Sequence, residues 1–374
     1  MNKITACILF TLLTIAQHKT IAQSLLTKKF LCDTCARKLH LRFESTAFMK
    51  NNEYLSKYAI GKTGIGFNAK PTLEYFFNKN TKINIGVYLL KYSGLNAFTQ
   101  SIPIFTLQHK LAKGNDLIFG NIYGNLNHEL AEPLYRFDRY YTNNIEYGFQ
   151  YLHKSKYFET DLWLNWEQFI FSGDPFQEEF TVGNHSKLKL INTSKFKFKG
   201  DFQSTLSHRG GEIDEFEGPA INLFSGAYGF DMDFIFKHIK CGISQKRFWY
   251  RGSNIPLSGP NFQHFNRGKG NYITSYLIHK VFNFKVGYWK GEKFISPKGE
   301  YLFMNISEDD KNLKQDVRQI LTGKFTLKRK ISKNLRLELR TEIYLDLDKP
   351  NTPDYTYGFY FVANELFFLK KLKK

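Results

Sequence analysis

The sequence predicts an all-β protein, a transmembrane antiparallel β-barrel of about 16 strands, within a range of roughly 14 to 18. Three observations predict this fold class. Long segments alternate between apolar and polar residues, connections between them alternate between short and long, and aromatic residues make up 17% of the chain. Alternation with a period of two indicates a strand with one apolar and one polar face. The aromatic content fits the girdles at the two edges of a membrane barrel.

The clearest strand covers residues 334–348. Its odd positions are leucine, isoleucine or threonine, and its even positions include Arg336, Glu338, Arg340 and Glu342. An ordinary strand in a globular protein has about five or six residues. Because this segment is more than twice as long, it suits a wall with lipid on one side and water on the other. We therefore expect its charged face to line the lumen.

Fifteen further segments are predicted as strands on the same grounds. They cover residues 39–48, 61–77, 81–92, 101–112, 116–125, 143–153, 157–169, 185–192, 196–208, 220–236, 240–250, 271–280, 282–290, 317–330 and 355–369. A soluble β-sandwich is the alternative, but its strands would be shorter.

The predicted connections alternate in length. Short ones fall at 78–80, 113–115, 154–156, 193–195, 237–239 and 331–333, and long ones at 126–142, 170–184, 209–219, 251–270 and 291–316. Membrane barrels have short periplasmic turns and longer external loops, so both ends of the barrel segment are expected on the periplasmic side. Residues 299–307 resemble a strand, and we expect them to form a protruding hairpin inside the loop 291–316.

The N-terminus has the pattern of a secretory signal peptide. Lys3 precedes the apolar run Ile4–Ala16, and Thr20 to Ala22 place small residues before the expected cleavage site. The predicted organisation is a signal peptide at 1–22, a periplasmic segment at 23–38, an outer-membrane barrel at 39–369 and a basic tail at 370–374. The expected location is the cell outer membrane.

The net charge of the chain indicates which kinds of partner it could bind. The chain carries a formal net charge of +19. The signal peptide and the even spread of charge argue against nucleic acid. Positive charge is expected to meet outer-membrane lipid and lipopolysaccharide, or an acidic glycan. The sequence does not indicate an oligomeric state.

The signal peptide, the long alternating strands and the aromatic final strand YTYGFYFVANELFFL resemble Gram-negative outer-membrane β-barrel proteins. Gln23 after the cleavage site, with the Lys-, Asn- and Phe/Tyr-rich composition, is similar to barrels of the Bacteroidota. The resemblance covers nearly all of the chain beyond the signal peptide and is architectural. It implies a porin, or a barrel of the polysaccharide-export or capsule-assembly type, and no motif identifies the subfamily.

Basic residues on the polar faces of predicted strands form the first candidate site. A lysine or arginine facing lipid at the bilayer midplane costs about 2–4 kcal/mol, so these residues are expected to line the lumen. The alternative is that the lysines lie near a periplasmic turn, in water or against headgroups. The residues are Lys187, Lys189, Lys195, Lys197, Lys199, Arg336 and Arg340.

Two further features are candidates. The loop 251–270, with Arg251, Arg267 and Lys269, is expected either to fold inward as a constriction or to remain an external surface loop. Cys32 and Cys35 form a CxxC pair, for which a disulfide is expected in an oxidising compartment.

The predicted function is an outer-membrane channel of the porin type for hydrophilic solutes, anionic or neutral. The alternative is a structural or interaction barrel in surface polysaccharide export or capsule attachment. HExxH and GxSxG are both missing from the sequence. We therefore expect no enzyme activity, no catalytic residues, no cofactor and no metal site.

Overall fold

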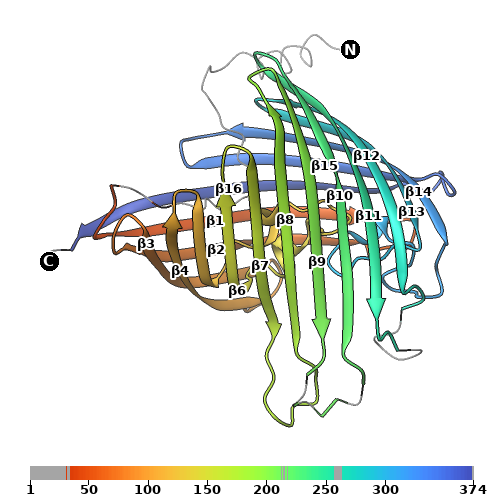
Figure 1. Ribbon diagram of the computed structural model, residues 1–374, viewed down its shortest axis with the longest axis horizontal. Coiled ribbons are helices and arrows are strands. Elements are labelled where there is room, and N and C mark those ends of the chain that lie inside the picture. Colours follow the sequence, from red (N-terminus) through yellow and green to blue (C-terminus); the bar gives the residue numbers. More distant parts are fainter. Residues whose placement is uncertain are drawn as a thin grey trace.

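The computed structural model describes residues 31, 34–211, 213, 215–216, 218–256 and 263–372. They form one closed antiparallel barrel of 16 strands, which confirms the predicted fold class (Figure 1). The strands are β1 (Lys38–Glu53), β2 (Lys62–Phe76), β3 (Thr81–Tyr92), β4 (Gln100–Ala112), β5 (Asn115–Asn121), β6 (Tyr147–Lys154), β7 (Phe158–Gln168), β8 (Glu179–Asn192), β9 (Phe196–Arg209), β10 (Ile221–Ile235), β11 (Ile239–Ser253), β12 (Arg267–His279), β13 (Phe282–Glu292), β14 (Val317–Lys330), β15 (Leu335–Asp346) and β16 (Asp354–Lys371).

Each strand pairs with the next one in sequence, and the barrel closes where β1 pairs with β16. The closing register runs from Lys38 opposite Lys371 to Glu53 opposite Tyr355. Long loops gather at one end of the barrel and short turns at the other, where β1 begins and β16 ends. These ends are called the loop side and the turn side below. Among the described residues, no helix is long and apolar enough to cross a membrane.

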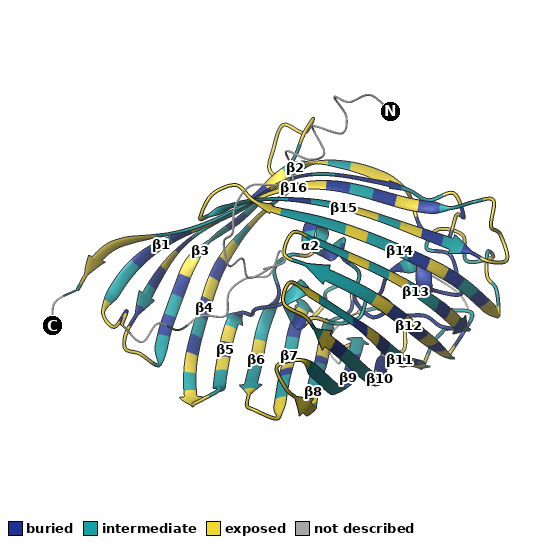
Figure 2. Cartoon of the chain, turned by 90° about the horizontal axis from the view of Figure 1, so that it is seen from above, coloured by how far each residue is buried: buried dark blue, intermediate teal, exposed yellow. Residues whose placement is uncertain are grey.

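The alternation of residues along β15 has the consequence expected from the sequence. Glu338 and Tyr344 point inward and are buried, whereas Thr341 and Ile343 point outward and are exposed. Figure 2 shows the same alternation of buried and exposed residues along most strands. Large apolar side chains such as Phe149 and Phe361 are about half exposed on the outer wall, at 58% and 49%. Such a belt is stable where it faces lipid.

Strands β5 and β6 are shorter than predicted. The chain leaves the wall after Asn121 and returns only at Tyr147. Pairing between β4 and β5 therefore stops at Thr106 opposite Gly120, and the loop-side part of β4 has no neighbour on that side. Pro103 lies in this unpaired part, where a residue without an N–H group is tolerated. The wall is consequently lower at β5 and β6 than at β4 and β7.

Two long loops fold into the barrel instead of extending away from it. The loop 122–146 contains the short helices η1 (Asn125–His128) and α2 (Arg139–Thr142), and α2 lies inside the ring of strands (Figure 2). The loop 293–316 contains η2 (Tyr301–Phe303). The predicted protruding hairpin at 299–307 is wrong, because Leu302 and Phe303 are buried in the lumen with apolar wall residues.

Several predictions fall partly on residues that are not described. The signal peptide at 1–22 and Cys32 lie outside the described residues, as does the end of the basic tail. Cys35 is buried and disulfide-bonded. Cys241 on β11 is a free thiol.

Candidate functional site

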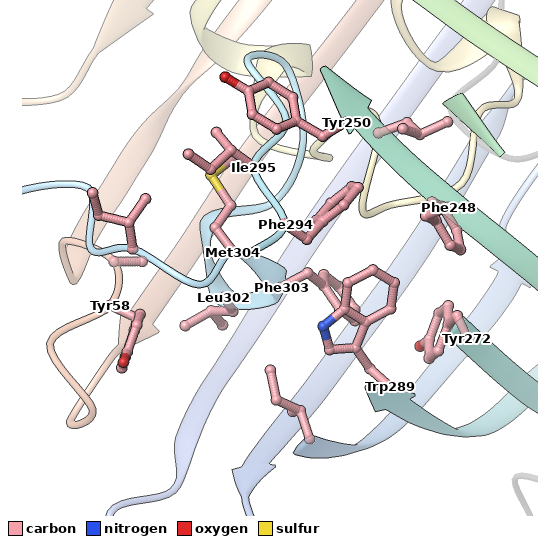
Figure 3. Packing of buried hydrophobic residues seen from close by; sticks show 14 of the residues in the cluster. Tyr58, Phe248, Tyr250, Tyr272, Trp289, Phe294, Ile295, Leu302, Phe303 and Met304 are labelled. Atoms are coloured by element: carbon pink, nitrogen blue, oxygen red, sulfur yellow. The ribbon is translucent and has the colours of Figure 1, made fainter. Parts of the chain in front are cut away.

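The loop 293–316 fills its part of the lumen by apolar packing. Phe294, Phe303 and Met304 enter a cluster of buried side chains contributed by the inner faces of β11, β12, β13 and β14 (Figure 3). Trp289 lies at its centre, with ring centroids 5.1 Å from Phe294 and 5.4 Å from Phe303. Burial of this much aromatic surface strongly favours the folded state.

Arg318 on β14 fixes the backbone of the same loop. Its guanidinium group donates to Asp346 Oδ2 at 2.9 and 3.0 Å, and to the carbonyl oxygens of Leu302 and Met304 at 3.0 and 2.5 Å. The group also lies 3.3 Å from the ring centroid of Tyr58. A buried charge with this many partners is well compensated, so it holds the loop instead of destabilising it.

The loop 122–146 packs Phe137 and Tyr141 against apolar wall residues, and charged and polar side chains attach it further. The carboxylate of Glu132 accepts hydrogen bonds from Lys324 on β14 and from Tyr344 on β15, the latter at 2.6 Å. Asp138 pairs with Lys50 on β1 and accepts a bond from Asn52 at 2.9 Å. These contacts connect one loop to widely separated parts of the wall.

His128 is the most enclosed of these anchoring residues. Its Nδ1 lies 3.0 Å from Asp161 Oδ2 on β7, and its Nε2 lies 2.9 Å from Glu146 Oε2. The imidazole stacks on Trp163 with ring centroids 3.6 Å apart. Ionised carboxylates only accept hydrogen bonds, so the arrangement favours the cationic ring, in which both nitrogens donate.

The electrostatic surroundings of His128 agree with this assignment. Burial lowers the pKa of the imidazole, but the adjacent carboxylates of Asp161 and Glu146 outweigh burial and raise the pKa above its ordinary value. Burial also raises the pKa of Glu146, and the charge of His128 reverses this and lowers it. Tyr135 donates a further short hydrogen bond to Glu146. His128 and Glu146 thus hold the loop in a charged, fully enclosed network.

A cavity of about 260 Å³ lies at the loop side, between β7–β10 and the loop 293–316. Its lining combines apolar groups such as Ile295 and Met304 with hydroxyl, carboxylate and cationic groups. Small-molecule sites in proteins commonly measure about 300–1,000 Å³, so the cavity suits part of a large ligand. Glu179 and Arg209, 2.8 Å apart at its border, are both partly exposed, so the cavity reaches solvent.

A chain of hydrogen bonds crosses the wall of this cavity. Ser207 and Thr181 occupy directly opposed positions on β9 and β8, and their hydroxyl oxygens lie 3.3 Å apart. Thr181 donates to Glu167 Oε1 at 2.6 Å, and the other carboxylate oxygen of Glu167 bonds Lys298. Burial lowers the pKa of the Lys298 ammonium, although Glu167 opposes this change. The cavity therefore contains a hydroxyl group connected to a carboxylate, with a cation beside it.

The sequence matches the family described as Lipid A 3'-O-deacylase-type over residues 28–372. The chain belongs to this family. No curated protein sequence matches it. The expectation that the protein is not an enzyme is therefore wrong, because the Lipid A 3'-O-deacylase-type family is described by an enzymatic activity.

Solved structures of bacterial outer-membrane barrels resemble the fold. The Vibrio cholerae outer membrane protein OmpT lacking loop L8 is 10% identical, with a TM-score of 0.53 over 88% of this chain and 100% of that one. Pseudomonas aeruginosa OprD is also 10% identical, with a TM-score of 0.53 over 91% of this chain and 99% of that one. At this identity the likeness concerns the fold alone. Together with the family, it identifies an outer-membrane β-barrel protein, as the sequence predicted.

Most of the predicted lumen lysines are paired with carboxylates in this deacylase-type barrel. Lys187 pairs with Glu129 of the loop 122–146. Lys189 lies 2.7 Å from Glu159, and Lys199 lies 3.0 Å from Asp233. Lys197 is partly exposed near the turn side, and Lys195 is exposed in the turn itself.

The predicted lumen arginines of β15 also have partners. Arg340 lies 3.1 Å from Glu342 and 3.8 Å from the ring centroid of Phe137, which belongs to the loop 122–146. Arg336 is 3.9 Å from Glu338. Both arginines therefore point inward, into a lumen of mixed charge.

Of the two alternatives expected for the loop 251–270, the structure does not show the inward constriction by Arg251, Arg267 and Lys269. These residues lie on β11 and β12, not in a loop, and their side chains are exposed on the outer wall. The inward positions between them are taken by glycines and by buried aromatic residues such as Tyr250. The lumen is narrowed instead by the loops 122–146 and 293–316.

Sequence reasoning missed the residues of the His128 network and of the hydrogen-bond chain at the cavity. Asp161 and Glu167 fall on the polar face of a predicted strand, so their inward direction was accessible from the alternation. Ser207 and Thr181 carry no comparable signal, because short hydroxyl side chains occur on both faces of strands. Among the described residues, no group of three or more His, Cys, Asp or Glu side chains is arranged to hold a metal ion.

Proposed function

We propose that this barrel hydrolyses an ester-linked acyl group of a lipid A-type glycolipid. The family supplies the reaction class, and the cavity at the loop side is the observation that carries the proposal. Longer loops of such barrels face the cell exterior, so this cavity lies on the side of the outer leaflet. Its mixed lining suits the junction of a sugar and an acyl chain, where one end of the ligand is polar and the other apolar.

The proposed chemistry uses the chain of hydrogen bonds across the cavity wall. Ser207 attacks the ester carbonyl carbon, and its proton passes through the Thr181 hydroxyl to Glu167. The carbonyl oxygen gains negative charge, which Lys298 and Arg209 stabilise. When the tetrahedral intermediate collapses, the bond to the sugar oxygen breaks and Glu167 returns the proton to that oxygen. Water then releases the acyl group from Ser207 by the reverse sequence.

The test is acyl release from bisphosphorylated lipid A by the full-length barrel in detergent micelles, followed by mass spectrometry. We expect Ser207→Ala and Glu167→Gln to lower the rate by about 100-fold or more, the range for a nucleophile or a general base. Ser204→Ala is the matched control, because Ser204 lies on the same strand β9 but points outward. If the wild type releases acyl groups and both cavity variants do so at the same rate, this site is excluded. If the wild type releases no acyl group, the reaction itself is excluded.

A channel for hydrophilic solutes is the second candidate. The charged residues that line the lumen on the turn side, including Arg42, Glu74 and Lys82, favour it. Both loops narrow the lumen, and the pairing of the lumen lysines leaves little excess positive charge to select anions. Export of a polysaccharide chain would require a still wider passage. Steady conductance of the wild type in planar bilayers would support the channel, and a closed barrel would exclude it.

A further inference from the structure

Five basic side chains gather on the outward face of three neighbouring strands near the loop side. They are named the outer basic patch and comprise Arg247, Arg251, Arg267, Lys269 and Lys290. All five are exposed, while the intervening positions on the same strands, such as Phe248 and Tyr272, are buried in the lumen. The patch is therefore on the opposite side of the wall from the cavity and the two loops.

The strand register brings the patch residues close together. Arg251 on β11 is directly opposite Arg267 on β12. Arg247 is opposite Asn271, which in turn is opposite Lys290 on β13. Directly opposed residues have Cβ atoms about 4.5–5.5 Å apart, and diagonal neighbours about 7–8 Å. Arg247 and Arg251 are four residues apart on β11, so the charges extend about 13 Å along the strand direction.

Most of these charges have no acidic partner on the protein. Lys269 lies 2.9 Å from Glu292. For Arg247, Arg251, Arg267 and Lys290, no carboxylate oxygen lies within 4 Å in the part of the chain that the structure describes. Like charges placed directly opposite each other destabilise a strand pair. An anion from outside the protein that lies between Arg251 and Arg267 would remove this repulsion.

The depth of the patch follows from the residues below it. Ile243, Ile273, Val286 and Leu321 are exposed outward positions closer to the turn side, and they form part of the apolar belt. The free-energy cost of a lysine or arginine that faces lipid is high at the midplane of the bilayer and falls nearly to zero at its edge. Tyr228 and Trp249 lie beside the patch, as expected for aromatic residues at the edge of a membrane. The patch therefore lies at the level of the headgroups of the outer leaflet.

We propose that the outer basic patch binds the phosphate groups of a phosphorylated glycolipid of the outer leaflet. Guanidinium groups bind phosphate oxygens in a bidentate manner, and the patch contains three arginines, of which Arg251 and Arg267 are directly opposite each other. Two phosphates on one sugar scaffold match several cations spread over three strands better than the single phosphate of a glycerol lipid. The site holds a lipid against the outer wall and does not depend on the proposed hydrolysis at the cavity.

The test measures retention of defined lipids by the full-length barrel in neutral detergent, using native mass spectrometry. The probes are bisphosphorylated lipid A, its enzymatically dephosphorylated form and phosphatidylglycerol. The variant R247Q/R251Q/R267Q removes three charges of the patch. The control variant K237Q/K280Q/R329Q removes three exposed charges near the turn side. The electrophoretic shift on heating shows that each variant is folded.

We expect the patch variant to retain bisphosphorylated lipid A at least about tenfold more weakly, as for the loss of charge-assisted hydrogen bonds. The control variant should retain it like the wild type, and wild-type retention should weaken with added salt. Equal retention of the dephosphorylated lipid or of phosphatidylglycerol by the wild type would overturn the proposal. So would equal losses in the two variants. Lipid retention and acyl release are measured separately, so this proposal and the proposed hydrolysis can fail separately.

Discussion

The two loops that enter the lumen differ in the balance of apolar and polar contacts that hold them there. The loop 293–316 is held by packed apolar side chains around Trp289 and Phe303. The loop 122–146 combines the apolar packing of Phe137 and Tyr141 with charged and polar contacts, among them those of His128 and Glu132 with the wall. Apolar packing has no preferred direction and changes little with pH or salt, whereas the polar contacts depend on protonation and geometry. The loop 122–146 can therefore respond to pH through His128, and the loop 293–316 can respond through Glu300, since burial raises the pKa of this carboxyl to about 8.

The largest expected effect concerns the apolar loop. Phe303→Ala removes a fully buried ring and leaves a cavity beside Trp289, so we expect a loss of about 3–5 kcal/mol in the free energy of unfolding. Urea titration of the folded barrel in micelles measures it. Phe359→Ala is the matched control, because Phe359 lies on the outer wall and is 45% exposed. A loss no larger than that of Phe359→Ala would contradict the packing role of the Phe303 ring.

A smaller, pH-dependent effect is expected in the polar loop. His128→Ala leaves the carboxylates of Glu146 and Asp161 without their cation, but Tyr135 and Gln150 still bond them. We therefore expect the free energy of unfolding to fall by about 1–3 kcal/mol at pH 6. Because the folded state raises the pKa of His128, its stabilisation is complete below its ordinary pKa of 6.5 and disappears as the pH rises through the raised value.

The measurement for His128 is the difference in unfolding free energy between wild type and variant across this pH range. The difference should shrink as the pH increases. His109→Ala, at an exposed position near the turn side, should change the stability by less than about 0.5 kcal/mol. A difference for His128→Ala that is constant from pH 6 to pH 9 would show that the imidazole acts only by packing against Trp163.

Much of the wall could be predicted from the sequence, because each residue of a membrane strand has only two directions available. The charged face of β15 follows directly from the parity of Arg336, Glu338 and Arg340. The same parity argument would have placed Arg251 outward, since it shares its side of β11 with the lipid-facing Ile243. The misassignment came from treating the end of the strand as part of a loop.

The contents of the lumen could not be predicted in this way. A loop rich in aromatic residues has the same composition whether it extends outward or folds inward, so the segment 299–307 gave no signal of direction. The contact between His128 and Asp161 joins residues 33 positions apart in the chain. It exists only because the loop enters a closed barrel, and local alternation contains no information about that closure. The cavity around Ser207 depends on the same loop placement.

Three of the four tryptophans lie against a glycine of the neighbouring strand. A Cβ atom added to Gly183 would lie 2.1 Å from the ring of Trp163, and one added to Gly226 would lie 2.1 Å from Trp249. Gly270 stands in the same relation to Trp289, at 2.2 Å. Strands that slid past one another by two positions during assembly would meet a side chain where each ring has to lie. These Trp–Gly pairs thus favour the correct strand register, which the sheet needs in order to close into a barrel.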